Sequence, residues 1–326
     1  MSKVFVLGAA GYIGREVVRE AVARGLAVQA LVRTDEQASA LRRLGATPVI
    51  GDVRESERWA FRLAGVDVLL DLVQPRLPER LTTAAIDRVA AERVEAMSEI
   101  VRALSNLPPE RRPLLMSVSG MTDLVKDERG FLSAASARRS PPVGFARIGV
   151  PVHELVLSSA LPAAFVHLGT VYGPGKAFAA RILPNLARGR MPIVGAGNNR
   201  KALVHVSDAA RALVHLLSLE RGALQGKTWL VADGANSTQR EFMEHAARLM
   251  NGPVPRRLPR WLVSLIIGSV SATLLAEDAP VDNTELLRSG FHFEHASHDT
   301  GLPATVRALR QSSSVEGVAS AVLVNS

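Results

Sequence analysis

The sequence predicts an α/β fold in which helices cover both faces of a doubly wound parallel sheet. Short apolar runs rich in β-branched residues, typical of buried strands, alternate with amphipathic helical stretches along most of the 326 residues. The first run ends in a glycine-rich turn that opens a helix, and a second run follows directly after that helix. A hydrophobic content of 47% with 21% charged residues indicates a globular chain with a large core.

The glycine-rich turn follows the first predicted strand, Val4–Leu7, and reads Gly8-Ala-Ala-Gly11-Tyr-Ile-Gly14. A strand, turn and helix in this order direct free N–H groups and the positive end of a helix dipole at one point, which suits a pyrophosphate. Gly8 would permit the turn, Gly11 would admit the phosphates, and Gly14 would bring the helix close to the strand. The spacing differs from G-x-G-x-x-G, and an ordinary strand–helix turn is the alternative, but the context favours dinucleotide binding.

The second predicted strand, 27–32, ends at Arg33. Sites that bind NAD place an acidic residue near this point to hold the ribose hydroxyls. Here Arg33, together with Arg15 after the last glycine, would pair with a 2′-phosphate. The sequence therefore favours NADP(H) over NAD(H), although Asp35 lies nearby and both arginines could instead be solvated surface residues.

The remaining elements keep the alternation of strand and helix. A helix at 36–44 and a strand at 47–50 come first, and Asp52 after them is placed to accept from an adenine amino group or to cap the next helix. Further strands are expected at 66–73, 114–119, 163–168 and 228–232, with helices near 83–104 and 151–159 and a short strand plus helix within 202–217. In a parallel sheet of this kind, ligands bind beyond the carboxyl ends of the strands.

Three segments interrupt the alternation. The loop at 120–149 is long enough for a lid or substrate loop, with disorder as the alternative. We expect residues 1–175 and 201–235 to form the dinucleotide-binding domain, and 176–200 with 236–309 to form a smaller, mostly helical substrate lobe. The Ser- and Ala-rich tail at 310–326 is expected to be poorly ordered.

Composition excludes several classes of function. With no cysteine, the chain has no disulfide or thiolate site, which fits a reducing cytoplasm. The net charge of +8 is spread along the chain and only 4% of residues are aromatic, so we expect no nucleic-acid partner. The most apolar stretch, 261–276, is too short to span a bilayer and predicts a buried or interfacial helix. No histidine–carboxylate motif is visible, so no metal site is expected, and no signal peptide precedes the first strand.

Several different short motifs follow one another along the chain in a characteristic order. They are Gly8-Ala-Ala-Gly11-Tyr-Ile-Gly14, Leu31-Val-Arg33, Gly51-Asp52-Val53, Gly65-Val-Asp67-Val, Ser117-Val-Ser119, Gly169-Thr-Val-Tyr172-Gly-Pro-Gly175, His205-Val-Ser-Asp208-Ala-Ala and Ser289-Gly-Phe291. With these motifs the chain, up to about Leu309, resembles the short-chain dehydrogenase/reductase superfamily, in its extended and atypical epimerase/dehydratase-like branches. The resemblance implies a Rossmann-type fold, a nicotinamide cofactor, and a substrate pocket between the sheet edge and the C-terminal lobe. The residues expected to bind the cofactor are Gly8, Ala10, Gly11, Tyr12, Ile13, Gly14, Arg15, Arg33, Asp52, Val53, Leu72, Val73 and Thr170.

The sequence departs from that family at the proton-handling pair. Members with ordinary redox chemistry carry Tyr-x-x-x-Lys at the start of the helix after the fifth strand, where the phenol exchanges a proton with the carbonyl oxygen. Counting back from Glu154 places Ala146 and Val150 at those positions. Phe145 retains a ring without the hydroxyl, and the pKa of Arg147 is too high for proton transfer.

Three side chains remain as catalytic candidates. Ser119 matches the region of the family's catalytic Ser/Thr, although it could only cap a strand end. Tyr172 belongs to a family turn near the nicotinamide and could donate a proton, with a structural role as the alternative. Lys126 in the long loop could act as an acid if it were desolvated.

These observations lead to one leading hypothesis and two rivals. The leading one is an atypical NADP(H)-dependent oxidoreductase that reduces a small, mostly apolar carbonyl or activated alkene without the usual Tyr/Lys pair. The rivals are a redox-neutral cyclase, isomerase or dehydratase on the same fold, and a non-catalytic, NADP(H)-responsive binding or regulatory protein. A small-molecule substrate and a cytoplasmic location are expected, and a homodimer is left open.

Overall fold

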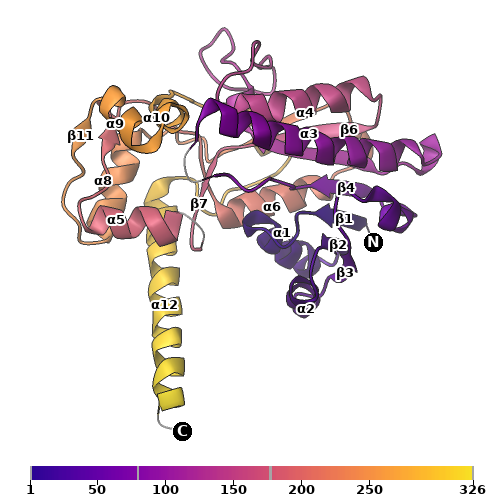
Figure 1. The fold of residues 1–326 in the computed structure, drawn as a ribbon, viewed down its shortest axis with the longest axis horizontal. Helices are drawn as coiled ribbons and strands as arrows, with labels where there is room; N and C mark the ends of the chain where they lie inside the picture. The colour runs from indigo at the N-terminus through magenta and orange to yellow at the C-terminus, as the bar shows by residue number, and fades with distance from the viewer. Residues whose placement is uncertain (1, 79–80, 176–177, 325–326) are drawn as a thin grey trace.

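The computed structural model describes residues 2–78, 81–175 and 178–324 and confirms the predicted α/β fold. Seven parallel strands form one sheet in the order β3-β2-β1-β4-β5-β6-β10. Figure 1 labels β1 to β4 at one side of this sheet. The strands are β1 (Lys3–Leu7), β2 (Ala27–Val32), β3 (Thr47–Ile50), β4 (Val68–Asp71), β5 (Leu114–Gly120), β6 (Ala163–Leu168) and β10 (Thr228–Val231). The strand order reverses direction at β1, so the carboxyl ends of β1 and β4 diverge there and leave a crevice for a ligand.

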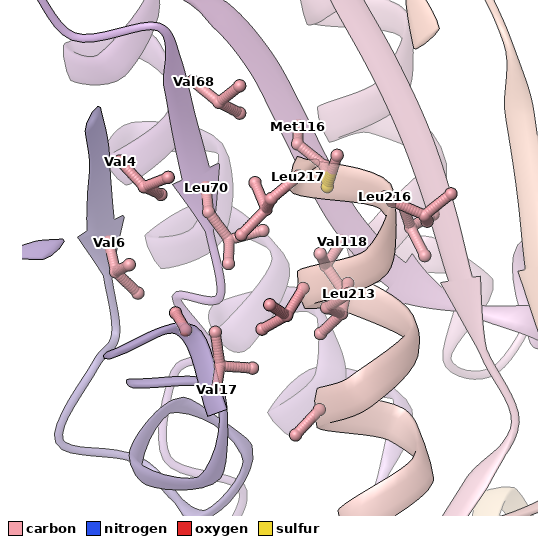
Figure 2. Close-up of a cluster of buried hydrophobic side chains, with 14 of the residues drawn as sticks. Val4, Val6, Val17, Val68, Leu70, Met116, Val118, Leu213, Leu216 and Leu217 are labelled. Atoms are coloured by element: carbon pink, nitrogen blue, oxygen red, sulfur yellow. The ribbon is translucent and has the colours of Figure 1, made fainter. Parts of the chain in front are cut away.

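Successive residues of the strands place their side chains alternately in two separate hydrophobic cores. Val4 and Val6 of β1 pack with α1 (Tyr12–Ala23), α2 (Asp35–Arg43) and α6 (Val206–Leu217), as Figure 2 shows in part. Phe5 and Leu7 face the opposite side, against α3 (Thr83–Ser105) and α4 (Ala146–Ser158). Because both faces are covered, the strands are apolar throughout rather than alternating.

A smaller, mostly helical region follows at the carboxyl edge of the sheet (Figure 1). Its helices are α5 (Leu183–Ala187), α8 (Gln239–Leu249), α9 (Arg260–Ile267), α10 (Ser269–Ala276) and α12 (His298–Val324). Two small parallel pairs complete it, β7 (Thr170–Tyr172) with β9 (Leu203–His205) and β8 (Ile193–Val194) with β11 (Arg257–Leu258). Two short helices, α7 (Arg221–Leu224) and α11 (Thr284–Arg288), pack back toward the sheet. Among the described residues, no helix has both the length and the apolar character needed to cross a membrane.

Two expectations about local structure were wrong. The apolar stretch 261–276 is two helices, because the chain reverses at Gly268, whose φ is +89°. The helix expected at 151–159 begins five residues earlier, at Ala146, and carries Pro151 inside it. The segment after 310 continues α12 to Val324; residues 325–326 of that tail, like 176–177 of the substrate lobe, lie outside the described part.

The long loop at 120–149 has a defined path rather than being disordered. A short helical turn, η4 (Met121–Asp123), opens it. Bridges then join Leu124 to Arg138 within the loop and Leu132 to Val281 in the C-terminal region. The loop therefore joins the sheet edge to the smaller lobe, which places it beside any ligand held between them.

Candidate functional site

The glycine-rich turn forms a cradle that only glycines fit. Gly8 has a φ of +76°, and a Cβ there would lie 2.6 Å from the carbonyl oxygen of Leu72 at the end of β4. A Cβ on Gly14 would lie 2.3 Å from the carbonyl oxygen of Gly8, so the missing side chain brings α1 close to β1. Gly11 caps α1 without a side-chain acceptor, which leaves the first-turn N–H groups of that helix for a ligand. The residues present therefore fit a dinucleotide pyrophosphate.

The other residues expected around the turn surround this cradle. Ala10 and Ile13 are partly buried against the sheet core, and Arg15 Nε donates to the Ala10 carbonyl at 3.1 Å. The Tyr12 phenol lies beside the turn at Gly173, and burial raises its pKa above the ordinary value. The cofactor turn and the loop after β7 are therefore in contact.

Arg33 and Asp52 follow neighbouring strands, β2 and β3, and lie near each other. Both charges are partly solvated, and Arg33 helps to hold the pKa of Asp52 below its usual range, after the larger effect of hydrogen bonds from Arg54. Asp52 accepts from the Arg54 backbone N–H at 3.0 Å and from its guanidinium at 3.1 and 3.2 Å. The structure places Asp52 in a turn, not at a helix N-cap as one of our alternatives had it, since Glu55 precedes the next helical turn. Val53 follows Asp52 and packs partly buried against the second core.

A buried ion pair that the sequence analysis missed supports the end of β4. Asp71 is fully buried and its carboxylate pairs with Arg93 of α3, which is 2% exposed. The other Asp71 oxygen accepts from the backbone N–H of Val73 at 3.0 Å, and the N–H of Leu72 donates to Leu7. The pair therefore fixes the Leu72–Val73 backbone against the cradle. No motif marked Asp71, because an acid within an apolar strand shows its partner only after folding.

Ser119, at the end of β5, shares a hydrogen bond between its Oγ and Oδ2 of Asp123. Asp123 is 1% exposed, and burial raises the pKa of its carboxyl to about 7, against opposing effects of the Ser119 hydrogen bond and the Arg139 charge. A carboxyl with such a pKa can donate a proton near neutral pH. Sequence reasoning missed Asp123, because nothing in the loop sequence shows that this acid is buried.

The Ser119–Asp123 pair packs against α4 at Gly149, where the helix carries no side chain. A Cβ on Gly149 would lie 1.9 Å from Asp123 Oδ2 and 2.4 Å from Ser119 Oγ, so any larger residue would displace the pair. Gly149 directly precedes Val150, where the family's lysine was expected, and Val150 is itself 2% exposed. The acid thus approaches α4 next to the position at which we expected the family's lysine.

The neighbouring residues of α4 do not replace the missing pair. Ala146 is fully buried. Phe145, directly before the helix, packs with a small cluster on α3 that contains Ile86. Arg147 Nε lies 2.6 Å from Asp87 Oδ1 of α3. These three side chains therefore serve the contact between α3 and α4.

Two histidines, His167 and His153, lie near the end of β5, and both are uncharged. His167 of β6 is 1% exposed, and its Nδ1 contacts the Gly120 carbonyl at 3.1 Å. Burial lowers the pKa of His167 to about 4 and that of His153 on α4 to about 3. Both imidazoles are therefore neutral near pH 7 and are poor proton donors there.

Tyr172 lies in the core of the smaller lobe, away from Ser119. It is 1% exposed and packs against Phe178 and Phe242, while a Cβ on Gly301 would lie 2.0 Å from its hydroxyl. Burial raises the pKa of its phenol well above the usual range. This location argues for the structural alternative rather than for proton donation.

A cavity of about 520 Å³ lies between the sheet edge and the smaller lobe, beside Gly120. Its walls come from the end of β5, the long loop, the β6–β7 junction and the segment after α10. The lining residues are Gly120, Met121, Thr122, Val125, Lys126, Leu132, Arg139, Leu168, Gly169, Thr170, Lys201, Ala202, Leu274, Glu277, Asp278 and Ala279. The predicted cofactor residue Thr170 and the candidate Lys126 are thus brought together here.

The cations of this cavity have partners. Lys126 Nζ lies 2.8 Å from Asp278 Oδ2, which Arg200 also contacts at 2.9 Å. Lys201 donates to the carbonyls of Leu274 at 2.9 Å and Glu277 at 3.2 Å, and burial lowers its pKa to about 8. These contacts hold the segment after α10 over the cavity, and Lys201 is a further residue that the sequence analysis missed.

The N-terminus of α6 is capped by a histidine side chain. His205, not Asp208, is the N-cap, and its Nδ1 accepts from the Ser207 N–H at 3.3 Å. The fully buried Asp208 instead accepts from the backbone N–H groups of Glu294 at 2.9 Å and His295 at 2.7 Å. Asp208 therefore anchors the segment before α12 and takes no part in the cavity.

The inference that histidines and carboxylates do not cluster was also wrong. His245 of α8 lies beside His298 and Asp299 of α12, with one potential ligand atom from each residue within 4.8 Å of the others. Asp299 Oδ1 lies 3.3 Å from His245 Nδ1 and 3.5 Å from His298 Nε2. Spacing along the chain hides this group, because its members come from two helices that meet only in the folded lobe.

Known proteins resemble this chain along most of its length. A 3-diazoavenalumate denitrifying reductase from Streptomyces sp. is 30% identical over 282 residues, 82% of this chain and 87% of that protein. A 4-hydroxy-2-methyl-3-oxo-4-farnesyl-3,4-dihydroquinoline-1-oxide ketoreductase from Stigmatella aurantiaca is 27% identical over 249 residues, 74% of this chain and 71% of that protein. The structure of human epimerase family protein SDR39U1 (isoform 2) with NADPH shares the fold, with a TM-score of 0.76 and 19% identity over 94% of this chain and 99% of that one.

The family assignment rests on a longer match. The family model described as NAD dependent epimerase/dehydratase family matches residues 4–232, from β1 to the end of β10. Together with the reductase-named relatives, it supports an NAD(P)-dependent, oxidoreductase-like role. The matched segment contains both the glycine cradle and Ser119. The chain therefore belongs to the NAD-dependent epimerase/dehydratase family.

Proposed function

We propose that this protein is an NADP(H)-dependent reductase of a small, mostly apolar carbonyl or activated alkene. The observation that carries this proposal is the buried Ser119–Asp123 pair beside a cavity at the carboxyl edge of the sheet. It offers a proton source where the family's tyrosine and lysine are replaced by Ala146 and Val150.

Two arginines support the preference for NADP(H). Arg15 and Arg33 are exposed on either side of the cradle, and among the described residues neither has a carboxylate partner. A guanidinium without a partner can bind a 2′-phosphate through charge-assisted hydrogen bonds. NADH lacks that phosphate, so the two arginines would add binding energy for NADPH alone.

When bound, the reduced nicotinamide supplies a hydride to the substrate carbon. The chain's own residues would supply the matching proton. Ser119 Oγ would donate its proton to the substrate oxygen and take one from the Asp123 carboxyl, so that the product is an alcohol and Asp123 is left ionised. Arg139, whose N–H donates to the Asp123 carbonyl at 2.7 Å and whose guanidinium pairs with Glu277, keeps this loop in place.

The cavity walls support an apolar substrate and the division into two lobes. Met121, Leu168 and Leu274 provide apolar surface from the loop, the sheet and the smaller lobe. Since the segment after α10 forms one wall, we assign residues 236–309 a part in substrate binding. The ketoreductase from Stigmatella, whose name specifies a farnesyl-bearing quinoline, is consistent with an apolar substrate class.

The proposal is tested by incubating the protein with NADPH and a panel of apolar ketones and enones. We expect loss of NADPH absorbance and formation of the corresponding alcohol or saturated ketone. If the protein binds NADPH but turns over none of the ketones or enones, the proposal is refuted and the non-catalytic alternative is favoured. A product of unchanged oxidation state would favour the cyclase, isomerase or dehydratase alternative.

A further inference from the structure

Helix α9 presents apolar side chains to solvent on the face opposite its packing face. Val263 is 2% exposed and packs against Val194 and Ala272. Trp261 and Leu265, one helical turn apart, are 66% and 68% exposed. Helices α9 and α10 lie side by side at the edge of the smaller lobe (Figure 1), so this outward face is accessible.

Arginines flank these apolar side chains. Val254, just before β11, is 72% exposed, and Arg256, Arg257 and Arg260 lie between it and Trp261 in the sequence and are exposed. We call the six residues the hairpin surface. They are Val254, Arg256, Arg257, Arg260, Trp261 and Leu265.

The hairpin surface is positively charged without local compensation. The sequence contains no acidic residue from 245 to 276. Among the described residues, Arg256 and Arg257 have no carboxylate partner, and Arg260 donates to the Thr273 hydroxyl at 2.7 Å. The chain's other exposed aromatic side chain of similar exposure, Phe61 at 64%, lies instead in a segment whose arginines alternate with acids.

We propose that the hairpin surface binds the headgroup region of an anionic lipid bilayer, an interaction that goes beyond the proposed reductase activity. A short helix with Trp and Leu on its outer face and arginines beside them is suited to lie in the plane of a membrane interface. The arginines contact lipid phosphates, and each adds attraction to an anionic surface. Three apolar side chains make too small a core for a stable protein interface, whereas they are enough to insert at the level of the headgroups.

This placement also brings the cavity close to lipid. Leu274 of α10 lines the cavity, and α10 packs directly on α9. An apolar substrate dissolved in the bilayer would then have a short path to the cavity. This last step rests on the proposed function, whereas lipid binding by the hairpin surface does not.

The test uses the full chain and vesicles of phosphatidylcholine with or without 30 mol% phosphatidylglycerol, about the anionic content at which basic residues bind. We expect co-sedimentation with the anionic vesicles, binding at least tenfold weaker to the neutral ones, and loss of binding in 0.5 M NaCl, about three times physiological ionic strength. Trp59 and Trp229 are 0% and 7% exposed, so a blue shift of tryptophan emission on binding would report Trp261.

Variants test whether vesicle binding depends on the hairpin surface rather than on nonspecific adsorption of the protein. Arg256→Gln/Arg257→Gln, or Trp261→Ser/Leu265→Ser, should weaken anionic vesicle binding at least tenfold. Trp261→Phe should bind normally but lose the blue shift.

The matched controls are Arg42→Gln/Arg43→Gln, an exposed pair at the end of α2, and Phe61→Ser. Neither should change vesicle binding. Because the tested residues are exposed, each variant should fold, which circular dichroism confirms.

Four outcomes would overturn the proposal. They are equal binding to neutral vesicles, insensitivity to salt, an equal loss in the control variants, or conversion of a dimer to a monomer by Trp261→Ser/Leu265→Ser. The last would identify the surface as an interface between copies of this chain. Lipid binding in a protein that reduces no ketone would refute only the proposed activity.

Discussion

Replacing Asp123 by asparagine tests the proposed proton path directly. Asparagine keeps the size of the side chain and can still contact Ser119, but it cannot release a proton near neutral pH. Because a positioned general acid contributes about 100- to 10,000-fold, we expect kcat for ketone reduction to fall by that factor. NADPH binding should be unchanged, since Asp123 lies apart from the glycine cradle.

The pH dependence of kcat/KM tests the role of Asp123 more specifically than the loss of kcat does. The pKa of Asp123 is raised to about 7 by burial, so the protonated, donating form declines above that pH. We expect kcat/KM of the wild-type protein to fall about tenfold for each pH unit above 7, and the residual rate of Asp123→Asn to lack this limb. A wild-type profile that stays flat to pH 9 would refute the reasoning.

The same carboxyl affects stability with a definite sign. Its pKa is raised in the folded state from the ordinary 3.8 to about 7, so the stabilisation is complete below pH 3.8 and is lost as pH rises from there through 7. At 1.36 kcal/mol per pKa unit, the loss is roughly 4 kcal/mol, and Asp123→Asn should not show it. Since the unfolded carboxyl is already largely ionised at pH 5, urea unfolding of both proteins at pH 5 and pH 8 should show roughly 3 kcal/mol of this loss in the wild type and none of it in the variant.

Asp233 supplies the matched control. It is 8% exposed, burial raises the pKa of its carboxyl to about 7, and its Oδ1 accepts from the Ala235 N–H at 3.0 Å, whereas Asp123 pairs with Ser119. Asp233→Asn should remove a similar pH dependence of stability while leaving the pH profile of kcat/KM as in the wild type. If Asp233→Asn altered that profile as Asp123→Asn does, the loss of the limb would reflect stability rather than proton transfer.

Three further predictions concern the cradle and the wall of the site. Arg33→Gln should raise the Kd for NADPH about tenfold, the loss of one charge-assisted contact, and leave the Kd for NADH unchanged by calorimetry; an equal loss for both would exclude a 2′-phosphate contact. Gly14→Ala should abolish NADPH-induced thermal stabilisation, because its Cβ would lie 2.3 Å from a carbonyl oxygen, whereas Gly222→Ala, with open space around it, should not. Gly149→Ala should lower the thermal stability and reduce kcat at least as much as Asp123→Asn does, because its Cβ would displace the Asp123 carboxyl. The double variant Gly149→Ala/Asp123→Ala should regain thermal stability but stay inactive. Recovered activity in that double variant would show that the carboxyl is dispensable.

The sequence by itself determined the fold and the cofactor cradle. Both depend on local patterns: apolar runs long enough for buried strands, and the glycine-rich turn, in which a Cβ on Gly8 or Gly14 would lie 2.6 or 2.3 Å from a backbone carbonyl oxygen. The likeness to a nucleotide-binding family rested on the same short-range spacing. It also predicts that Ala146 and Val150 stand where the family carries its tyrosine and lysine, and this stays a prediction.

Only the tertiary structure decided what occupies the region beside the missing pair. Asp123 acquires its raised pKa because the long loop folds back and buries it against Gly149 of α4. Packing against Phe178 and Phe242 encloses Tyr172 in the core of the smaller lobe, although its place in a family turn near the nicotinamide had made it a candidate. Proton affinity depends on burial and on neighbouring charges contributed by distant segments, and no spacing along the chain encodes these.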